Sequence, residues 1–385
     1  MIKGAGVLFL TPDNQALFLK RGPGGDFPGT WCLPGGHIED GETALVAAMR
    51  EATEECGFEW PKDAADALEV LARTKTPKVS PTVAVSAPVE SVQSSETVAA
   101  PQASEPEFID FTTFFGRVDG PFFPKLNDEH VGYAWAPVQS PPEPLHPGVG
   151  TATRRLFMDE LDIAKAIAAG ELTSPQKYKN LWLFALRITG TGLAFRAKHD
   201  EWVWRKPEIY LNEEFLQRSS GLPVVWVHPP KAVLDSKEFG DRVIGTILYP
   251  YIKGDEVWGI AKILDDTAAK WMTETKLSTS PGVVLGNPSS PDVRLKDEDG
   301  RTILIEGKPA LLDHLAVCGI TESPNGDLEG IPGVWDKMGP LTGVQVDSQP
   351  KGVTVIYKRR RSDAFRKLDS SVKFIELSES VARLR

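Results

Sequence analysis

The sequence predicts an α+β protein of two domains, the second of them rich in β-strands. Three observations lead to this fold class. With 385 residues the chain is longer than one hydrophobic core usually serves, so two domains are expected. Its first part alternates apolar runs with Gly/Pro turns and contains an amphipathic helix pattern. From about residue 181 onward, many short apolar runs are typical of strands.

Composition narrows the class of protein. Hydrophobic residues make up 41% of the chain and charged residues 25%, which indicates a globular protein. The net charge of -10 argues against an extended nucleic-acid surface. The cysteines Cys32, Cys56 and Cys318 are scattered and odd in number, which favours a reduced, cytoplasmic chain. No stretch approaches the roughly 20 apolar residues of a membrane span, so we expect a soluble protein with no membrane partner.

The first domain is expected to span residues 1–170. A hairpin of Gly4–Leu10 and Gln15–Lys20 should precede a helix at Leu45–Cys56. Phe108–Phe115 predicts a further strand, and Thr151–Gly170 is a helical segment.

A segment of different composition interrupts this domain at about 74–107. It consists mainly of Ser, Pro, Ala, Val and Thr, and it contains no aromatic residue. Such a segment cannot bury enough surface to offset its chain entropy. We therefore predict a disordered insertion between the helix and the strand that begins at Phe108.

The second domain is expected at 181–325, followed by an extended tail at 326–385. The predicted strands are Leu181–Ile188, Leu222–Val227, Val243–Leu248, Val257–Ile263, Val283–Leu285 and Thr302–Ile305. Helical patterns lie near Asn212–Ser219 and Asp266–Glu274. The result is a β-rich α+β domain.

The strongest motif is a set of carboxylates on the predicted helix. Glu54 and Glu55 follow Glu51 by three and four residues, so all three share one helix face. Clustered carboxylates repel one another, and a hard divalent cation such as Mg²⁺ offsets that cost. Gly36 lies in a Pro-Gly-Gly turn that lets the backbone approach a ligand, and Gly57 suits a left-handed helix end. A solvated acidic helix end is the simpler alternative.

This segment resembles the Nudix box, Gly-x5-Glu-x7-Arg-Glu-U-x-Glu-Glu-x-Gly-U, in which U is a bulky aliphatic residue. Every invariant position matches from Gly36 to Gly57, and the two U positions hold Ala52 and Phe58. The resemblance covers about 1–165 and implies a Nudix α/β/α sandwich with a mixed sheet. It also implies a pyrophosphohydrolase that splits a nucleoside diphosphate derivative.

The resemblance also implies roles for individual residues. Glu51, Glu54 and Glu55 would ligate Mg²⁺ or Mn²⁺, and Glu54 would also be catalytic. Arg50 would hold Glu51 in place, and Glu42 would support the loop or the metal shell.

Two further assignments complete this site. Gly36 would lie against the bound cofactor. Glu129, in the segment Asn127–Trp135, resembles a position at which such domains often supply another acidic ligand. An ordinary loop acid is the alternative at this position, and the nucleotide substrate stays open.

A second group of chemically reactive residues lies in the β-rich domain. His228 ends an apolar strand, Ser278 and Ser280 stand near a glycine, and Asp313-His314 begins a later strand. A serine becomes a nucleophile when a base takes its proton and a third group orients that base. Turn serines and a structural histidine are the alternative interpretation.

The order of these segments resembles the phage prohead maturation proteases and a related family of uncharacterised phage head proteins, over about 181–320. By this resemblance His228 is the base, and Ser278 or Ser280 is the nucleophile, with Ser278 preferred. Asp313 or His314 would orient the base. Pro281, between the second serine and Gly282, departs from the pattern.

Together these resemblances predict a phage head-assembly protein with a Nudix hydrolase domain and a serine-protease-like capsid maturation domain. Its partners would be a nucleoside diphosphate derivative and a capsid or scaffold protein. It would act in the host-cell cytoplasm or inside the assembling head. The alternatives are a Nudix hydrolase with a non-catalytic partner-binding domain, or a structural capsid-associated protein whose sites have decayed.

Overall fold

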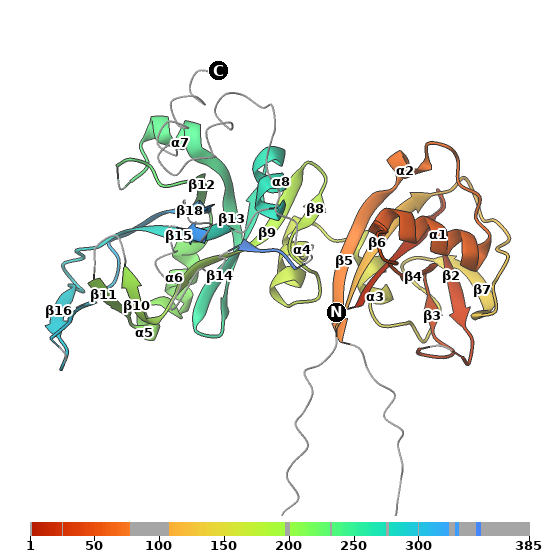
Figure 1. Ribbon diagram of the computed structural model, residues 1–385, viewed down its shortest axis with the longest axis horizontal. Coiled ribbons are helices and arrows are strands. Elements are labelled where there is room, and N and C mark those ends of the chain that lie inside the picture. Colours follow the sequence, from red (N-terminus) through yellow and green to blue (C-terminus); the bar gives the residue numbers. More distant parts are fainter. Residues whose placement is uncertain are drawn as a thin grey trace, which may run out of the picture. The chain divides into compact units, whose positions relative to one another are not determined.

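The computed structural model describes nine stretches of the chain: 2–24, 26–77, 108–196, 201–231, 233–274, 277–298, 300–322, 328–330 and 344–347. The chain divides into two compact units, Met1–Phe157 and Met158–Arg385 (Figure 1). Within the described ranges, no helix is long and apolar enough to cross a membrane.

A mixed β-sheet forms the framework of the first unit. Its strands are β1 (Ile2–Leu10), β2 (Gln15–Arg21), β3 (Trp31–Cys32), β4 (Gly35–His37), β5 (Glu69–Pro77), β6 (Phe108–Arg117) and β7 (His130–Pro137). They follow the order β3-β2-β1-β6-β5, with β4 paired to β1 and β7 paired to β2. Strands β1 and β6 run parallel, whereas β1 and β4 run antiparallel. The predicted α/β fold with a mixed sheet is confirmed.

Helix α1 (Ala44–Cys56) carries the acidic motif, and local signals set both of its ends. The hydroxyl of Thr43 caps its first turn by accepting the backbone N–H of Val46. Gly57 ends it in the left-handed conformation, with φ of 65°, as predicted. Its apolar side packs on β1 and buries Ala47, Ala48, Ala52 and Cys56. The acidic residues lie on an adjoining side of the helix, and Glu55 among them is itself buried.

Two boundaries of the first unit differ from the sequence predictions. Strand β5 continues to Pro77 because Thr74 to Pro77 pair with β6, so order extends into the predicted insertion. The rest of that insertion, 78–107, lies outside the described residues. The helical segment expected at Thr151–Gly170 is two helices, α3 (Val149–Arg155) and α4 (Glu160–Ala168).

The break between these helices has a local cause. Asp159 caps α4 through the backbone N–H groups of Leu161 and Asp162, and Asp162 completes a capping box. Helix α4 then packs on β9, β13 and β14 of the second unit. The first unit consequently ends at Phe157 instead of near residue 170. It also contains the short helix α2 (Ala64–Ala67).

The second unit is built on two sheets. Its strands are β8 (Gln176–Tyr178), β9 (Leu181–Gly190), β10 (Gly192–Arg196), β11 (Glu201–Arg205), β12 (Pro223–Trp226), β13 (Val243–Lys253), β14 (Glu256–Ile263), β15 (Leu277–Val284), β16 (Val293–Lys296), β17 (Thr302–Ile305), β18 (Leu311–Glu322), β19 (Leu328–Gly330) and β20 (Val344–Gln345). Among the described residues, nine strands form one sheet, with the path β15-β18-β12-β13-β14-β9-β20. The other sheet has the order β10-β11-β17-β16.

Helices pack against the larger sheet and enclose its core. They are α4, α5 (Pro207–Tyr210), α6 (Glu213–Ser219), α7 (Ser236–Arg242) and α8 (Asp266–Glu274). Buried side chains of the strands and helices, among them Phe184, Phe215, Met272 and Leu315, form the main hydrophobic core. The described part of the second unit is therefore rich in β-structure.

Two details of the second unit change the sequence interpretation. Strand β15 begins at Leu277 instead of Val283, so Ser278 and Ser280 belong to a strand and not to a turn. Part of the expected tail is paired, since Val344 and Gln345 extend the larger sheet along β9. The tail residues 331–343 and 348–385 lie outside the described residues.

Candidate active sites

The glycine turn brings the backbone into contact with helix α1. Strand β4 pairs with β1, so that Gly35 lies opposite Gly6 and Gly36 opposite Ala5. A Cβ atom on Gly36 would stand only 2.5 Å from Oε1 of Glu51. Only glycine lets the turn lie this close to the Glu51 carboxylate.

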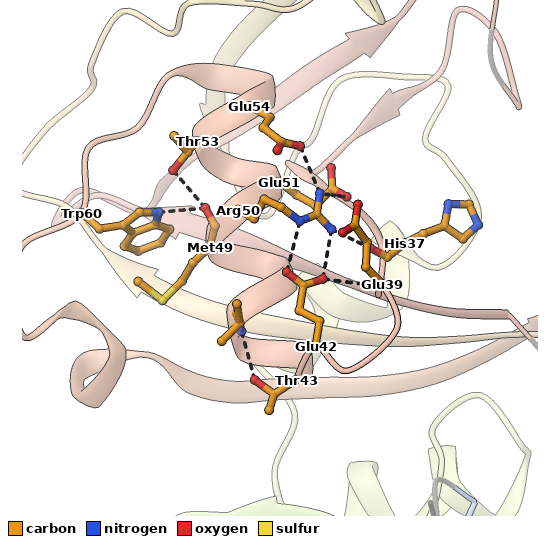
Figure 2. Close-up of polar contacts among 11 residues, drawn as sticks. His37, Glu39, Glu42, Thr43, Met49, Arg50, Glu51, Thr53, Glu54 and Trp60 are labelled. Atoms are coloured by element: carbon orange, nitrogen blue, oxygen red, sulfur yellow. Dashed lines mark hydrogen bonds and ion pairs between the residues drawn. The ribbon is translucent and has the colours of Figure 1, made fainter. Parts of the chain in front are cut away.

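Arg50 is the centre of a charged network on this side of α1 (Figure 2). Its Nη1 donates to Oε1 of Glu51 at 2.8 Å and to Oε2 of Glu54 at 3.0 Å. Its Nε and Nη2 each donate to a different oxygen of Glu42 at 3.1 Å. Nη2 also donates to the carbonyl of His37 at 2.9 Å. These five bonds match the five N–H donors of a guanidinium group.

The network shifts the pKa values of its members. The hydrogen bonds that Arg50 donates to Glu42 lower the pKa of Glu42. The pKa of Arg50 is raised first by the same bonds to Glu42 and then by its bond to Glu51. For Glu51, burial raises the pKa and outweighs the opposing effect of Arg50. Arg50 thus stays charged, and Glu42 ionises more readily than a free glutamate.

Glu55 lies in the most enclosed part of the site. It is 3% exposed, and its Oε2 accepts the backbone N–H of Gly35 at 2.7 Å. Burial raises its pKa to about 8, with smaller contributions from the charges of Glu51 and Glu129. The carboxylates of the site therefore repel one another as well as being poorly hydrated.

His130 borders Glu55, and the sequence analysis did not single it out. Its Nε2 lies 3.8 Å from Oε1 of Glu55 and 3.4 Å from the Cys32 sulfur, and its Nδ1 lies 3.0 Å from Oδ1 of Asn127. Burial lowers its pKa to about 4, so the imidazole is neutral near pH 7. The one signal for His130 in the sequence is that it directly follows Glu129.

The oxygen atoms of the acidic side chains are ligands that suit a hard divalent cation. Glu51, Glu54, Glu55 and Glu129 offer carboxylate oxygens, which Mg²⁺ and Mn²⁺ prefer. Glu129 is close enough for its charge to raise the pKa values of both Glu51 and Glu55. Within the described part of the chain, no three acidic, histidine or cysteine side chains are already arranged as a metal centre.

A cavity of about 460 Å³ borders these carboxylates. Glu51, Glu55 and Glu129 are among its lining residues, while β5 and β6 contribute Thr74, Thr76, Ile109, Phe111 and Thr113. The ring of Phe111 lies over β1 beside Gly4, where a Cβ would come within 2.7 Å of it. Much of this part of the lining is therefore uncharged.

An aromatic pair stands at another wall of the cavity. The rings of Phe27 and His146 meet edge to face, with centroids 4.8 Å apart. Burial lowers the pKa of His146, which favours its neutral form. Phe27 has a φ of 53°, which is uncommon for a residue with a side chain. These residues come from separate loops, and no motif in the sequence identified them.

A second cluster joins three of the residues singled out in the β-rich domain. Nδ1 of His314 lies 2.8 Å from Oδ2 of Asp313, and its Nε2 lies 2.8 Å from Nδ1 of His228. An ionised carboxylate only accepts, so the proton of a neutral His314 belongs on Nδ1. His228 then donates from Nδ1 to His314, which leaves Nε2 of His228 as its acceptor nitrogen.

The surroundings hold His314 in this arrangement. Its side chain is 1% exposed, and burial lowers its pKa although Asp313 acts in the opposite direction. A Cβ on Gly282 would lie 2.3 Å from the His314 ring, so only glycine fits there. Oδ2 of Asp313 also accepts the backbone N–H of Leu234 at 2.9 Å, which helps to position the carboxylate.

Both candidate serines share a sheet face with His314. In the antiparallel pairing of β15 with β18, Gly282 lies opposite His314, Ser280 opposite Ala316 and Ser278 opposite Cys318. Directly opposed residues project from the same face of a sheet. Ser280 is therefore the diagonal neighbour of His314 on this face, and Ser278 lies two residues further along β15. Both serines are buried, at 4% and 2% exposure.

Comparison with known proteins identifies the first unit. Residues 2–156 match the family model of the NUDIX domain. The chain is 45% identical over 56 residues to a Bacillus subtilis (strain 168) protein described as "Putative 8-oxo-dGTP diphosphatase", a match that covers 14% of this chain. This match spans only 35% of the curated relative. Residues 2–156 therefore form a Nudix domain.

Solved structures that match part of this chain include several Nudix proteins. The MutT protein from Methanosarcina mazei Go1 is 19% identical, with a TM-score of 0.25, and the match covers 36% of this chain and 78% of that one. The Nudix hydrolase RenU from M. smegmatis is 24% identical, with a TM-score of 0.27, and the match covers 40% and 82%. The NUDIX domain of Shewanella oneidensis NrtR, complexed with ADP ribose, is 13% identical, with a TM-score of 0.29 and coverage of 41% and 86%.

Proposed function

We propose that the Nudix domain is a pyrophosphohydrolase that splits a nucleoside diphosphate derivative. The observation that carries this proposal is the carboxylate network around Arg50 on the lining of a cavity. Carboxylates suit a divalent cation, and the cavity volume lies in the range of ligand pockets. A polyphosphate held beside these carboxylates by the cation would leave the nucleoside against the uncharged lining residues.

Glu51, Glu54, Glu55 and Glu129 would hold Mg²⁺ or Mn²⁺. When bound, the cation would neutralise charge on the pyrophosphate and lower the pKa of the attacking water. Arg50 positions Glu51 and Glu54, and Glu42 in turn holds Arg50 by two hydrogen bonds. Since the N–H groups of Arg50 bond within the chain, its role is to position ligands and not to bind substrate. Gly36 allows the turn to pack against Glu51.

The nucleoside part of the substrate would enter between β6 and the Phe27–His146 pair. Aromatic rings and threonine hydroxyls suit an uncharged, planar, hydrogen-bonding group such as a nucleobase. An oxidised guanine nucleotide is the first candidate to test, because the Bacillus subtilis relative is described as acting on 8-oxo-dGTP. Other nucleoside diphosphate derivatives belong in the same panel.

Hydrolysis of a nucleotide panel with Mg²⁺ or Mn²⁺ tests this proposal. We expect cation-dependent release of a nucleoside monophosphate, and a loss of about 100- to 1,000-fold in kcat for Glu54→Gln. Glu59→Gln is the matched control, because Glu59 is also exposed and lies just beyond α1. Absence of cation-dependent turnover, or full activity of Glu54→Gln, would exclude the assignment.

For the second domain we propose a serine protease activity. The specific observation in its favour is the chain of contacts from Asp313 through His314 to His228, beside a strand that carries two buried serines. Nε2 of His228 would take the proton of the serine hydroxyl as its oxygen attacks the peptide carbonyl. The same nitrogen would then protonate the leaving amine. His314 and Asp313 would orient His228 and stabilise its charged form.

The proposed substrate is a capsid or scaffold protein, and the proposed role is phage head assembly. This part rests on the resemblance of residues 181–320 to prohead proteases and phage head proteins. The proposed location is the host cytoplasm or the interior of the assembling head. A non-catalytic partner-binding domain and a capsid-associated protein with decayed sites remain the competing proposals.

Labelling with a fluorophosphonate reagent separates these proposals without a known substrate. An active site should label one serine, so Ser278→Ala or Ser280→Ala should abolish labelling and the other variant should retain it. His228→Ala should slow labelling strongly, whereas Lys231→Ala, at an exposed position nearby, should not. A chain that does not label, and does not cleave a co-expressed head protein, would exclude the protease.

A further inference from the structure

A short segment from the C-terminal region, residues 344–347, lies along one edge of strand β9. Strand β14 pairs with the other edge of β9 from Trp182 to Gly190. On the edge of interest, β8 pairs with residues 181–183, and β20 continues at Ala185 and Leu186. Only two residues of the segment enter the ladder, so contacts outside the ladder contribute much of what holds it.

Ser174 makes three hydrogen bonds to this segment. Its hydroxyl donates to the carbonyl of Gln345 at 2.6 Å and accepts the backbone N–H of Ala185 at 2.9 Å. The N–H of Ser174 donates to Oδ2 of Asp347 at 2.8 Å, and its carbonyl accepts the N–H of Asp347 at 2.9 Å. Ser174 is fully buried, and it joins the segment to β9 where the ladder between them ends.

The side chains of the segment alternate between an apolar and a polar side, as in any extended strand. Val344 is buried in the main core of the second unit, and Val346 packs against the same core. Gln345 points the other way, where its Oε1 accepts a hydrogen bond from Nζ of Lys253 at 3.2 Å. Its Nε2 donates to the carboxylate of Asp347 at 2.8 Å. Two valines and one carboxylate are thus the groups that the site distinguishes.

This division of contacts is the one that strand edges use to bind peptides. Main-chain hydrogen bonds to the edge supply affinity, and pockets for alternate side chains supply specificity. The N–H of Ser174 adds a charge-assisted bond to the carboxylate of Asp347. Among the described residues β20 pairs with β9 alone, whereas β9 is also held by β14 and β8. The segment can therefore leave without breaking any other strand pairing described for this sheet.

We propose that this edge of β9, with Ser174 and Lys253, is a peptide-binding site for an extended segment of the form Val-x-Val-Asp. Residues 344–347 are its tethered ligand, and an added peptide with the same pattern competes with them for the site. The site depends on neither of the two proposed activities.

Fluorescence anisotropy of a labelled peptide with the sequence of residues 341–350 tests the proposal on the full chain. In the wild-type chain the tethered segment competes with the peptide as an intramolecular ligand. Val344→Asp puts a charge at a core position and should release the tethered segment. We expect this variant chain to bind the peptide about ten-fold more tightly than the wild-type chain does, because its own segment no longer competes.

A second variant keeps both valines in place. Asp347→Ala removes only the carboxylate that accepts the N–H of Ser174, so the core stays intact, and peptide binding should tighten about three-fold. Val293→Asp is the matched control, because Val293 is 45% exposed on β16, and this variant should bind the peptide as the wild-type chain does. A peptide that itself carries the Val344→Asp change should bind about ten-fold more weakly than the native peptide.

Three results would overturn the proposal. The first is a native peptide that binds neither Val344→Asp nor Asp347→Ala, with the fold of both checked by circular dichroism. The second is equal affinity of the wild-type chain and both variants, which would mean that the tethered segment does not occupy the site. The third is equal binding of the native and the altered peptide, which would mean that the valine is not recognised.

Discussion

Replacing Arg50 by lysine changes the geometry of the Nudix site while keeping its charge. Arg50 donates five hydrogen bonds, to three carboxylates and to the carbonyl of His37. A lysine ammonium has three donors at one point and cannot reproduce the planar fork. Arg50→Lys therefore loses at least two of the five bonds, and the paired contact with both oxygens of Glu42 cannot be kept.

The magnitude follows from the number of bonds and their exposure. Each lost bond to a charged group costs about 1–2 kcal/mol, reduced from the buried value because the Arg50 side chain is 24% exposed. For two lost bonds we expect folding stability to fall by about 2–4 kcal/mol. If one to two kcal/mol of transition-state stabilisation is lost through poorer positioning, kcat falls by about 5- to 30-fold.

Steady-state kinetics with a cation titration is the assay. The Mg²⁺ concentration for half-maximal rate should rise, because Glu51 and Glu54 lose their support. KM for the nucleotide should change little, because the N–H groups of Arg50 bond within the chain. Arg154→Lys, at an exposed arginine of α3, is the control. An unchanged kcat, or a large rise in KM alone, would refute the positioning role.

Two further predictions concern the second unit. Glu306 is 1% exposed and accepts hydrogen bonds from Nε of Arg205 at 2.5 Å and from the hydroxyl of Tyr210 at 2.8 Å. Glu306→Ala should therefore cost about 3–5 kcal/mol, because it leaves the buried guanidinium of Arg205 without its acid. Urea unfolding compares it with Lys231→Ala, in an exposed ion pair, which should cost much less. Burial lowers the pKa of His314, so the neutral imidazole stabilises the folded state. This contribution to stability is complete above pH 6.5, the usual pKa of histidine, and is lost as the pH falls through the lower pKa of the folded state. Unfolding at pH 7.5 and 5 should show a smaller loss for His314→Gln than for the parent chain, and equal losses would contradict the assignment.

The acidic helix was predictable from the sequence because its determinants are local. Spacings of three and four residues place Glu51, Glu54 and Glu55 on one side, and Gly57 marks the helix end. The alternation of apolar runs likewise predicted strands such as β1 and β9. The paired strands β10 and β11 were not recognised. Their shortness left too few residues for a clear pattern.

The tertiary structure decided which distant residues meet. His228 and His314 are 86 positions apart, and their contact exists because β12 and β18 are neighbours in one sheet. Ser278 and Ser280 share a face with His314 only through the register of β15, which a shift of one residue would reverse. His130 reaches Glu55 through the pairing of β7 with β2. Local spacing specifies a helix face, whereas strand order and register depend on packing of the whole core, which no short segment encodes.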